Sequence, residues 1–339
     1  MKTTCTHRCV FYIFLILSIT VTASGSEEII GTRPGASGQP LTIEGTLFLL
    51  DVSKVDGADQ SFTADVFMML RWKDERLASG SEGMRRLPVG SIWNPRVQII
   101  NQRRIWKTFP EVVDVSPDGT VVYRQRFYGQ FASALDLRDF PFDRHRFRVQ
   151  VVIPGYGPDE IEFLPMPGGL GIGRSPELTV PDWSIGALDV RTAPYAVIPG
   201  ARTIAGLEGA FEAQRHLGFY VGKAFVSVAI IVFMSWVVFW LGPEHVGPRL
   251  SVAVTSMLTL VAYRFLLGQS LPPVSYLTRL DHFLLGATIL VFVALMQVAA
   301  TSAMHSKDRA DRATAINRVS RGVFPAAFVL LIVASFWLF

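Results

Sequence analysis

Six side chains between Arg249 and Pro273 recur at the spacing of one helical face. They are separated by 4, 3, 4, 3 and 4 residues, which is the repeat of an α-helix. The face carries hydroxyls at one end, apolar groups in its middle and an amide at the other end: Ser251, Thr255, Leu258, Ala262, Phe265 and Gln269. Hydroxyls can replace the lost hydration of an ion, and rings of leucine or phenylalanine can close a narrow path by excluding water. The pattern is typical of a helix that lines water.

A second interpretation of this face stays open. Ser251 and Thr255 could instead bond back to their own helix or pack between helices, as hydroxyls often do in membranes. One helix cannot enclose a path, so the first interpretation requires several copies around an axis. Glu244, Pro248 and Arg249 would then stand at the inner mouth of the pore. Arg264 lies beside the face, where it could extend toward the interface or pair across subunits.

The composition indicates the environment in which such a helix must lie. The chain has 339 residues, of which half are apolar and only 18% are charged. Soluble proteins carry roughly 25% charged residues, so a disordered or wholly aqueous chain is excluded. The net charge is +4 and falls to +2 without Lys2 and Arg8. A charge so near zero gives no reason to expect a nucleic-acid partner.

Residues 1–23 have the pattern of a secretory signal peptide. Lys2 and Arg8 precede an apolar run that ends at the small residues Val21-Thr22-Ala23, and the run is short for a retained anchor helix. Both cysteines, Cys5 and Cys9, lie in this segment. The mature protein would therefore have neither a disulfide nor a cysteine-bound metal, and residue 24 onward would be exported.

Residues 24–216 are predicted to form an extracellular β-sandwich. Short β-rich runs alternate with turn signals such as Asp56-Gly57 and Asp118-Gly119, and no helical pattern interrupts them. We expect strands at Thr46–Val52, Ala64–Trp72, Arg96–Ile100, Val121–Phe131 and Phe147–Ile153.

Residues 217–339 are predicted to form a transmembrane domain, because four apolar runs are each about long enough to cross a ~30 Å hydrocarbon core. We expect helices at about 217–241, 249–270, 279–304 and 320–339. Four crossings from an exported start place both termini outside the inner (cell) membrane. The short cytoplasmic loop 305–321 then carries five basic residues, as the positive-inside rule requires. The exported part carries a net charge of −3, which would attract cations.

Several motifs resemble the pentameric ligand-gated ion channels (the Cys-loop receptor superfamily), in particular their bacterial branch. The resemblance covers about Leu41 to Phe339, and its most specific part is the signature loop Leu135–Asp143. Eukaryotic members bridge this loop with a disulfide, whereas the corresponding positions here are Ser133 and Phe147, as in bacterial members. The other matching motifs are Trp72–Leu77, Trp93-Asn94-Pro95, Ser235-Trp236, Leu271-Pro272-Pro273 and Tyr276.

The resemblance implies a homopentamer around a central pore that passes monovalent ions across the lipid bilayer. A small agonist bound between neighbouring outer domains would open the pore. Asp56, Asp143 and Arg215 would carry the signal to the membrane, with the guanidinium shared by both carboxylates. The resemblance also assigns Pro272 and Tyr276, which follow the expected pore helix, to the same relay. A salt bridge that only joins the two domains is the alternative.

The resemblance leaves the agonist and the ion selectivity open. Amine-binding members use an aromatic box, and Phe67, Tyr156 and Tyr195 are the rings that could form one here. Gating by protons is a second option, for which Asp59, His145 and His282 are candidates, although His145 has the pattern of a solvated strand edge. Cation-passing relatives usually carry glutamate where Pro248 stands, and a proline is typical of anion-passing ones. The acidic outer domain and the bacterial precedent favour cations.

A different class of function also remains open. The β-domain could bind a partner while the helices only anchor it, as in a non-conducting envelope receptor, but one plain crossing would suffice for that. We find no G-x-S-x-G, H-E-x-x-H, phosphate-loop or dinucleotide fingerprint. The sequence therefore predicts neither an enzyme nor a cofactor or metal site.

Overall fold

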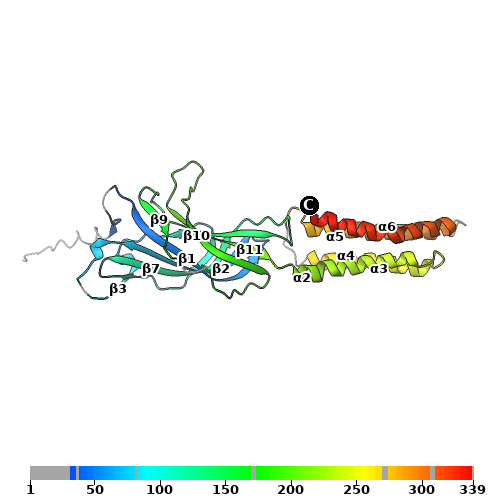
Figure 1. The fold of residues 1–339 in the computed structure, drawn as a ribbon, viewed down its shortest axis with the longest axis horizontal. Coiled ribbons are helices and arrows are strands. Elements are labelled where there is room, and N and C mark those ends of the chain that lie inside the picture. The colour runs from blue at the N-terminus through cyan, green and yellow to red at the C-terminus, as the bar shows by residue number, and fades with distance from the viewer. Residues whose placement is uncertain are drawn as a thin grey trace, which may run out of the picture.

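The computed structural model describes residues 31–35, 38–80, 82–168, 173–268, 274–305 and 310–337. The expected signal peptide with both cysteines lies outside these residues, as do Gln269 and Pro272. The described chain is elongated, with a β-domain at one end and a bundle of helices at the other (Figure 1). The predicted combination of a β-sandwich with four transmembrane helices is confirmed.

The β-domain consists of two sheets whose strands bury one face each. Along β7 every second residue faces the core, which is the pattern of a strand with one buried face. The larger sheet has the order β3-β6-β7-β2-β1-β9 with β5 also paired to β7, and the smaller has the order β10-β11-β8-β4. The strands are β1 (Leu41–Asp56), β2 (Ser61–Lys73), β3 (Arg85–Pro88), β4 (Gln98–Ile99), β5 (Gln102–Lys107), β6 (Val112–Val115), β7 (Thr120–Ala132), β8 (Arg144–Val152), β9 (Ile161–Pro165), β10 (Trp183–Thr192) and β11 (Gly206–Arg215).

An aromatic cluster joins the two sheets near the end of the domain that faces the helices. Phe62 and Phe131 of the larger sheet stack with ring centroids 5.2 Å apart. Phe62 also contacts Phe147 and Phe211 of the smaller sheet at 4.8 and 5.7 Å. All four rings are buried, and such pairs contribute about 0.5–1.5 kcal/mol beyond their burial. The cluster fixes the sheets against each other close to the loops that contact the helices.

The predicted strands agree with the structure in place but not in extent. Four of the five fall almost wholly within β1, β2, β7 and β8, whereas the fifth shrinks to the two residues of β4. The sequence does not predict β3, β5, β6, β9, β10 or β11, because these segments lie between turns in runs without a clear period.

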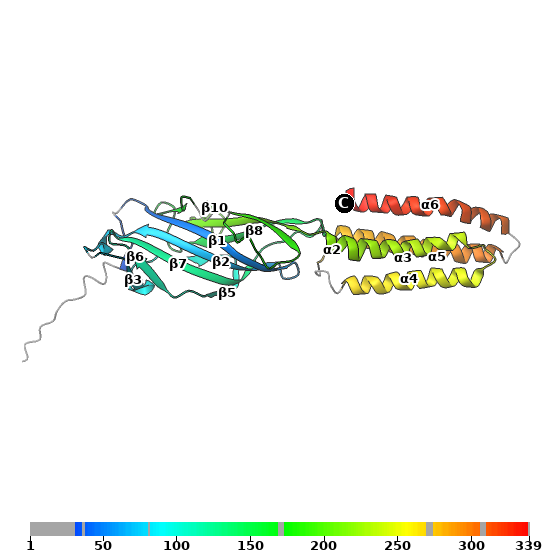
Figure 2. The same ribbon diagram turned by 60° about the horizontal axis from the view of Figure 1, so that its bottom comes forward.

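Four helical crossings follow β11, each long and apolar enough to span a membrane. The first is composite: α2 (Gly218–Tyr220), a π-helical turn (Val221–Phe225), α3 (Val226–Val237) and a 3₁₀ turn (Val238–Trp240). The others are α4 (Val246–Gly268), α5 (Arg279–His305) and α6 (Ala310–Trp337). In Figure 2, α4 and α6 lie on opposite sides of α3 and α5, and the end of α6 lies beside the β-domain.

The fourth helix begins at Ala310, ten residues before the predicted start at 320. Most of the expected loop 305–321 is therefore helical. The first turns of α6 carry Asp311, Arg312 and Arg318, which are all exposed. Hydropathy marks only the apolar part of a helix, so it missed this polar extension.

Candidate functional site

The face of α4 with the hydroxyl-to-apolar pattern is not packed against the rest of the protomer. Leu258 is 68% exposed and Phe265 is 74% exposed, and Ser251, Thr255 and Ala262 are exposed as well. The opposite face is buried by the other helices through Ala253, Ser256 and Leu260. The patterned face is therefore available to water or to another copy of the chain.

The hydroxyls on this face do not bond back to their own helix. Within the described residues, such bonds are made by Ser256 to the Val252 carbonyl at 2.8 Å and by Thr259 to the Thr255 carbonyl at 2.7 Å. No hydrogen bond of the Ser251 or Thr255 hydroxyl to another described residue is found. These two groups thus remain free to solvate an ion, which a hydroxyl engaged in a back-bond does less readily.

Arg249 does not stand at the inner mouth of the patterned face, contrary to the prediction. Its side chain is fully buried among the helices of its own protomer. Its Nη2 atom donates to Thr301 Oγ1 on α5 at 3.1 Å and to Asn317 Oδ1 on α6 at 3.0 Å. The sequence spacing already put Arg249 two residues away from Ser251, and the helix turns it by about 200° from that face.

The other two predicted mouth residues are exposed. The Glu244 side chain is 58% exposed and lies 3.9 Å from the ring of His245. Pro248 falls in the first turn of α4, where a missing N–H costs no helical hydrogen bond. The exposed acid and the buried guanidinium leave this end of the helix without an exposed lysine or arginine among residues 242–251, where the exposed basic side chain is the imidazole of His245.

A buried ion pair lies where the β-domain meets the helices. Arg215, the last residue of β11, donates from Nε and Nη2 to the two oxygens of Asp143 at 2.9 and 3.0 Å. Asp143 also lies 2.8 Å from Nε2 of His145. The guanidinium is 4.2 Å from the Trp183 ring centroid and 4.8 Å from that of Phe140. Charged hydrogen bonds and ring faces together hold this cation where water is scarce.

The ionisation of Asp143 reflects two opposing effects. Burial alone would raise the pKa of its carboxyl, but the hydrogen bonds from His145 and Arg215 outweigh burial and lower it. Asp143 therefore stays charged at neutral pH. His145 is buried in this pair with a side chain only 6% exposed, so its interpretation as a solvated strand edge is wrong. Asp143 precedes His145 by two residues, and residues two apart on an extended chain lie on the same side. This spacing is the signal in the sequence that could have indicated the contact between the two side chains.

Asp56 does not share the guanidinium of Arg215, as the resemblance had implied. Its Oδ2 accepts from Lys54 Nζ at 2.6 Å, and its Oδ1 accepts from the backbone N–H groups of Ala58 and Asp59. The Lys54 ammonium and these N–H groups lower the pKa of Asp56. The β1–β2 turn thus satisfies its own carboxylate, and Asp59 is an exposed part of that turn.

The signature loop docks directly onto the outer ends of the helices. The Tyr276 hydroxyl accepts from the backbone N–H of Leu137 at 2.8 Å. Arg279, at the start of α5, donates to Asp139 at 2.8 Å and to the Phe336 carbonyl near the end of α6 at 2.8 Å. The sequence does not indicate the contact between Arg279 and Asp139, because no local pattern joins residues 140 positions apart. A displacement of this loop must therefore act on α5, α6 and the segment that follows α4.

The three candidate ligand-binding rings do not form one box within the protomer. The Tyr156 hydroxyl accepts from Trp93 Nε1 at 3.2 Å, so that ring is part of the β-domain packing. Tyr195 lines a separate pocket beside the β10–β11 loop. Phe67 lies on β2 of the larger sheet, and its ring centroid is 6.2 Å from that of Phe109. His282, the remaining proton candidate, lies in the first turn of α5 with Nδ1 2.9 Å from the Thr278 carbonyl.

Two family models match the two halves of the chain. The ligand-binding domain of neurotransmitter-gated ion channels matches residues 30–166, and the transmembrane region of the same channels matches residues 228–328. The chain belongs to the pentameric ligand-gated ion channel family. Members of this family are channels rather than enzymes. The chain is accordingly a multi-pass membrane protein with four transmembrane helices.

Two curated relatives show how far the similarity extends. The proton-gated ion channel of Gloeobacter violaceus is 24% identical over 318 residues, which cover 92% of this chain and 87% of the relative. The gamma-aminobutyric acid receptor subunit beta-4 of Gallus gallus is 23% identical over 275 residues, which cover 79% of this chain and 56% of that subunit. This ligand-gated channel chain thus matches the first relative over nearly its full length and the second over little more than half.

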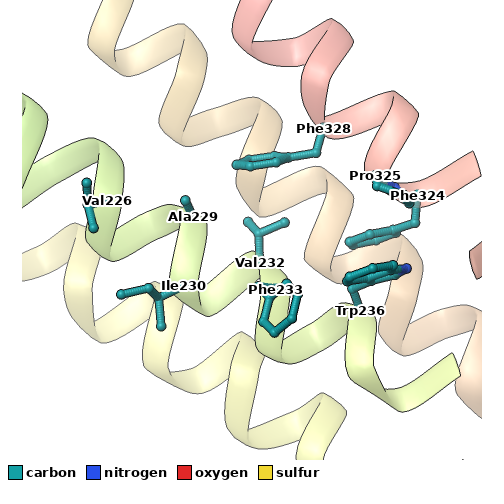
Figure 3. A pocket seen from close by; sticks show the side chains of 9 residues that line it. All are labelled: Val226, Ala229, Ile230, Val232, Phe233, Trp236, Phe324, Pro325 and Phe328. Atoms are coloured by element: carbon teal, nitrogen blue, oxygen red, sulfur yellow. The ribbon is translucent and has the colours of Figure 1, made fainter. Parts of the chain in front are cut away.

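The channel chain also has an apolar groove of about 410 Å³ between α3 and α6 (Figure 3). Pro325 lacks the N–H that would bond the Arg321 carbonyl inside α6, and Trp236 Nε1 donates to that carbonyl instead at 3.1 Å. Arg321 in turn donates to the Phe239 carbonyl at 3.0 Å. A backbone carbonyl freed inside a membrane needs such a partner, so this contact fixes α6 against the first crossing.

Proposed function

We propose that the chain forms a homopentameric, agonist-gated cation channel in which α4 of each subunit lines the pore. One observation carries the proposal: in a chain of this family, the hydroxyl-to-apolar face of α4 is left exposed by its own protomer. A lipid-facing surface gains nothing from Ser251 and Thr255, whereas a ring of five such faces encloses water. Leu258 and Phe265 would then close the path by excluding that water.

The proposed orientation places the β-domain outside the cell (inner) membrane. Residues 1–23 act as the signal peptide, residues 24–216 form the extracellular domain, and residues 217–339 form the transmembrane domain. The end of α6 lies beside the β-domain, as four crossings require (Figure 2). The first turns of α6 carry the exposed Arg312 and Arg318 at the opposite end of the bundle, where the positive-inside rule expects basic residues.

Cation selectivity is supported by the charges at the inner end of α4. Arg249 is buried inside the subunit, so its charge adds no exposed basic ring to the path. Glu244 is the exposed charged side chain nearest to the helix start, and the extracellular domain is acidic overall. Five exposed carboxylates around an axis raise the local concentration of cations. Anion selectivity, which the proline at position 248 would suggest, is the alternative.

The proposed relay runs from an agonist between extracellular domains to the outer ends of the helices. Arg215 and Asp143 join the last strand to the signature loop, and Tyr276 joins that loop to the segment after the pore helix. A shift of either sheet therefore reaches the helices through contacts made of hydrogen bonds and buried charge.

Cysteine accessibility tests the pore assignment with a matched pair of leucines on α4. Leu258→Cys lies on the proposed pore face, and Leu260→Cys lies two residues along the same helix on the fully buried face. A soluble cationic thiol reagent should block current through Leu258→Cys channels in planar bilayers and leave Leu260→Cys channels unchanged. Equal protection of both positions, or a monomeric purified protein, would exclude the pore.

Reversal potentials in asymmetric salt test the selectivity separately. A potential near that of the cation gradient supports the cation channel, and a potential near that of the anion gradient supports the alternative. A protein that assembles but carries no current under any condition would instead be a non-conducting receptor.

A further inference from the structure

A pocket of about 460 Å³ beside the β10–β11 loop (residues 193–205) has the chemistry of an anion site. Ligand pockets typically measure ~300–1,000 Å³, so a small organic molecule fits. Its walls come from β5, the end of β7, β8 and the β10–β11 loop. They include two guanidinium groups and two hydroxyls, from Arg103, Arg148, Ser133 and Tyr195, and no acidic residue.

The amide side chains of this pocket are occupied by the backbone around them. Asn101 accepts from the Gln150 N–H at 3.2 Å and donates to the carbonyls of Ala132 and Arg148. Gln150 donates to the Ala193 carbonyl at 3.0 Å, which ties the root of the β10–β11 loop to β8. These bonds build the walls and leave the charged and hydroxyl groups to meet a ligand.

The two guanidinium groups are poorly matched by acids of the protein. Among the described residues, Arg103 makes no ion pair or side-chain hydrogen bond. Arg148 lies 3.8 Å from Glu208, a carboxylate that Arg191 already holds at 2.8 Å and that Arg146 also approaches to 3.8 Å. Three arginines around one glutamate leave a surplus of positive charge beside the pocket.

From this surplus we propose that the pocket binds a small carboxylate, which acts as the agonist. Guanidinium groups bind carboxylates through charged, directional hydrogen bonds, and the hydroxyls of Ser133 and Tyr195 add neutral donors. An amine is disfavoured here, because two positive charges repel it and Tyr195 supplies a single ring where ring faces must surround a cation. The agonist role rests on the proposed channel function, whereas binding of the carboxylate does not.

A calorimetric titration of the purified full-length protein with succinate, at constant ionic strength, tests the binding. We expect succinate to bind and 1,4-diaminobutane, which has the same number of carbons and opposite charge, not to bind. Arg103→Gln or Arg148→Gln should each weaken succinate binding about 10- to 100-fold, the effect of one charged hydrogen bond. Both side chains are at the surface, so these variants should fold, and Arg148→Lys should retain part of the affinity.

Arg146→Gln is the matched control. Arg146 lies on the same strand and face as Arg148, is similarly exposed and is equally far from Glu208, but it does not line this pocket. The control should bind succinate like the unaltered protein. Absence of succinate binding, an equal loss in Arg146→Gln and Arg148→Gln, or arginine-dependent binding of the diamine would each overturn the inference.

Bilayer recordings separate this inference from the proposed function. Succinate that opens a current in the unaltered protein, but not in Arg148→Gln, supports both. Arginine-dependent binding with no current under any condition keeps the carboxylate site and removes the channel. A current that opens to another stimulus, together with no binding of succinate, keeps the channel and removes the site.

Discussion

Replacing Arg215 by methionine should strongly destabilise the protein. Methionine keeps the unbranched apolar stem but has neither the charge nor the donor groups, so Asp143 would lose both hydrogen bonds from the guanidinium. The two side chains are only 10% and 1% exposed, and solvent could not replace these bonds. Removing one partner of a buried pair costs about 3–5 kcal/mol. For a domain of this size that corresponds to a fall of about 6–20 °C in the melting midpoint.

Thermal unfolding of the purified full-length protein, at one scan rate and neutral pH, measures this fall. Arg202→Gln is the control, because Arg202 pairs with Asp159 at a position where both side chains are largely exposed. Such surface pairs contribute little, so the control should melt close to the unaltered protein. The double variant Arg215→Met/Asp143→Asn should recover at least part of the loss, because it removes the unpaired charge. Melting of Arg215→Met within a degree or so of the control would refute the reasoning.

Four further predictions follow from the pore, the domain junction and the helix contacts. Leu258→Ser should admit water to the constriction and raise spontaneous current in planar bilayers, and an unchanged closed state would contradict that gate. Thr255→Lys should lower cation conductance or shift the reversal potential toward anions, whereas indifference would place Thr255 away from water. The lowered pKa of Asp143 means that its ion pair stabilises the protein at neutral pH and that this stability is lost as the pH falls through the folded pKa, below about pH 4. The melting midpoint of Asp143→Asn should therefore fall less at acid pH than that of the unaltered protein. Midpoints of the two proteins that fall in parallel with pH would contradict this role of Asp143. Trp236→Phe should cost about 1–3 kcal/mol because it leaves the Arg321 carbonyl without a donor, and a midpoint no lower than that of the exposed Trp106→Phe would disprove this.

The predictions that succeeded from sequence all rest on periodic patterns or on contiguous motifs. Apolar runs longer than a bilayer is thick can only be helices, because lipid offers no partner for free backbone groups. β-Rich runs bounded by turn signals predicted β1, β2, β7 and β8, and the contiguous signature loop indicated the family. The face of α4 follows from the helical repeat alone, which places Ser251, Thr255 and Leu258 on one side before any neighbour is known.

The contacts between distant residues were decided by the tertiary structure. Sequence placed Arg249 at the mouth of the pore, but packing of α4 against α5 and α6 turned it toward Thr301 and Asn317. The resemblance implied that Arg215 pairs with both Asp56 and Asp143. In the structure Asp56 pairs with Lys54 instead, and His145 is the second side chain that bonds Asp143.

The physical reason for this division is the range over which each interaction acts. Helical and strand periods are set by the backbone within a few residues, so they can be found in the sequence. Which charge meets which depends on how sheets and helices pack, and a shift of one residue on a strand or helix gives a side chain a different neighbour. The sequence thus determined which part of the chain folds in water and which in the membrane, the four membrane-spanning helices and the family. Packing alone decided where each guanidinium points, and with it the charge along the proposed pore and in the pocket beside the β10–β11 loop.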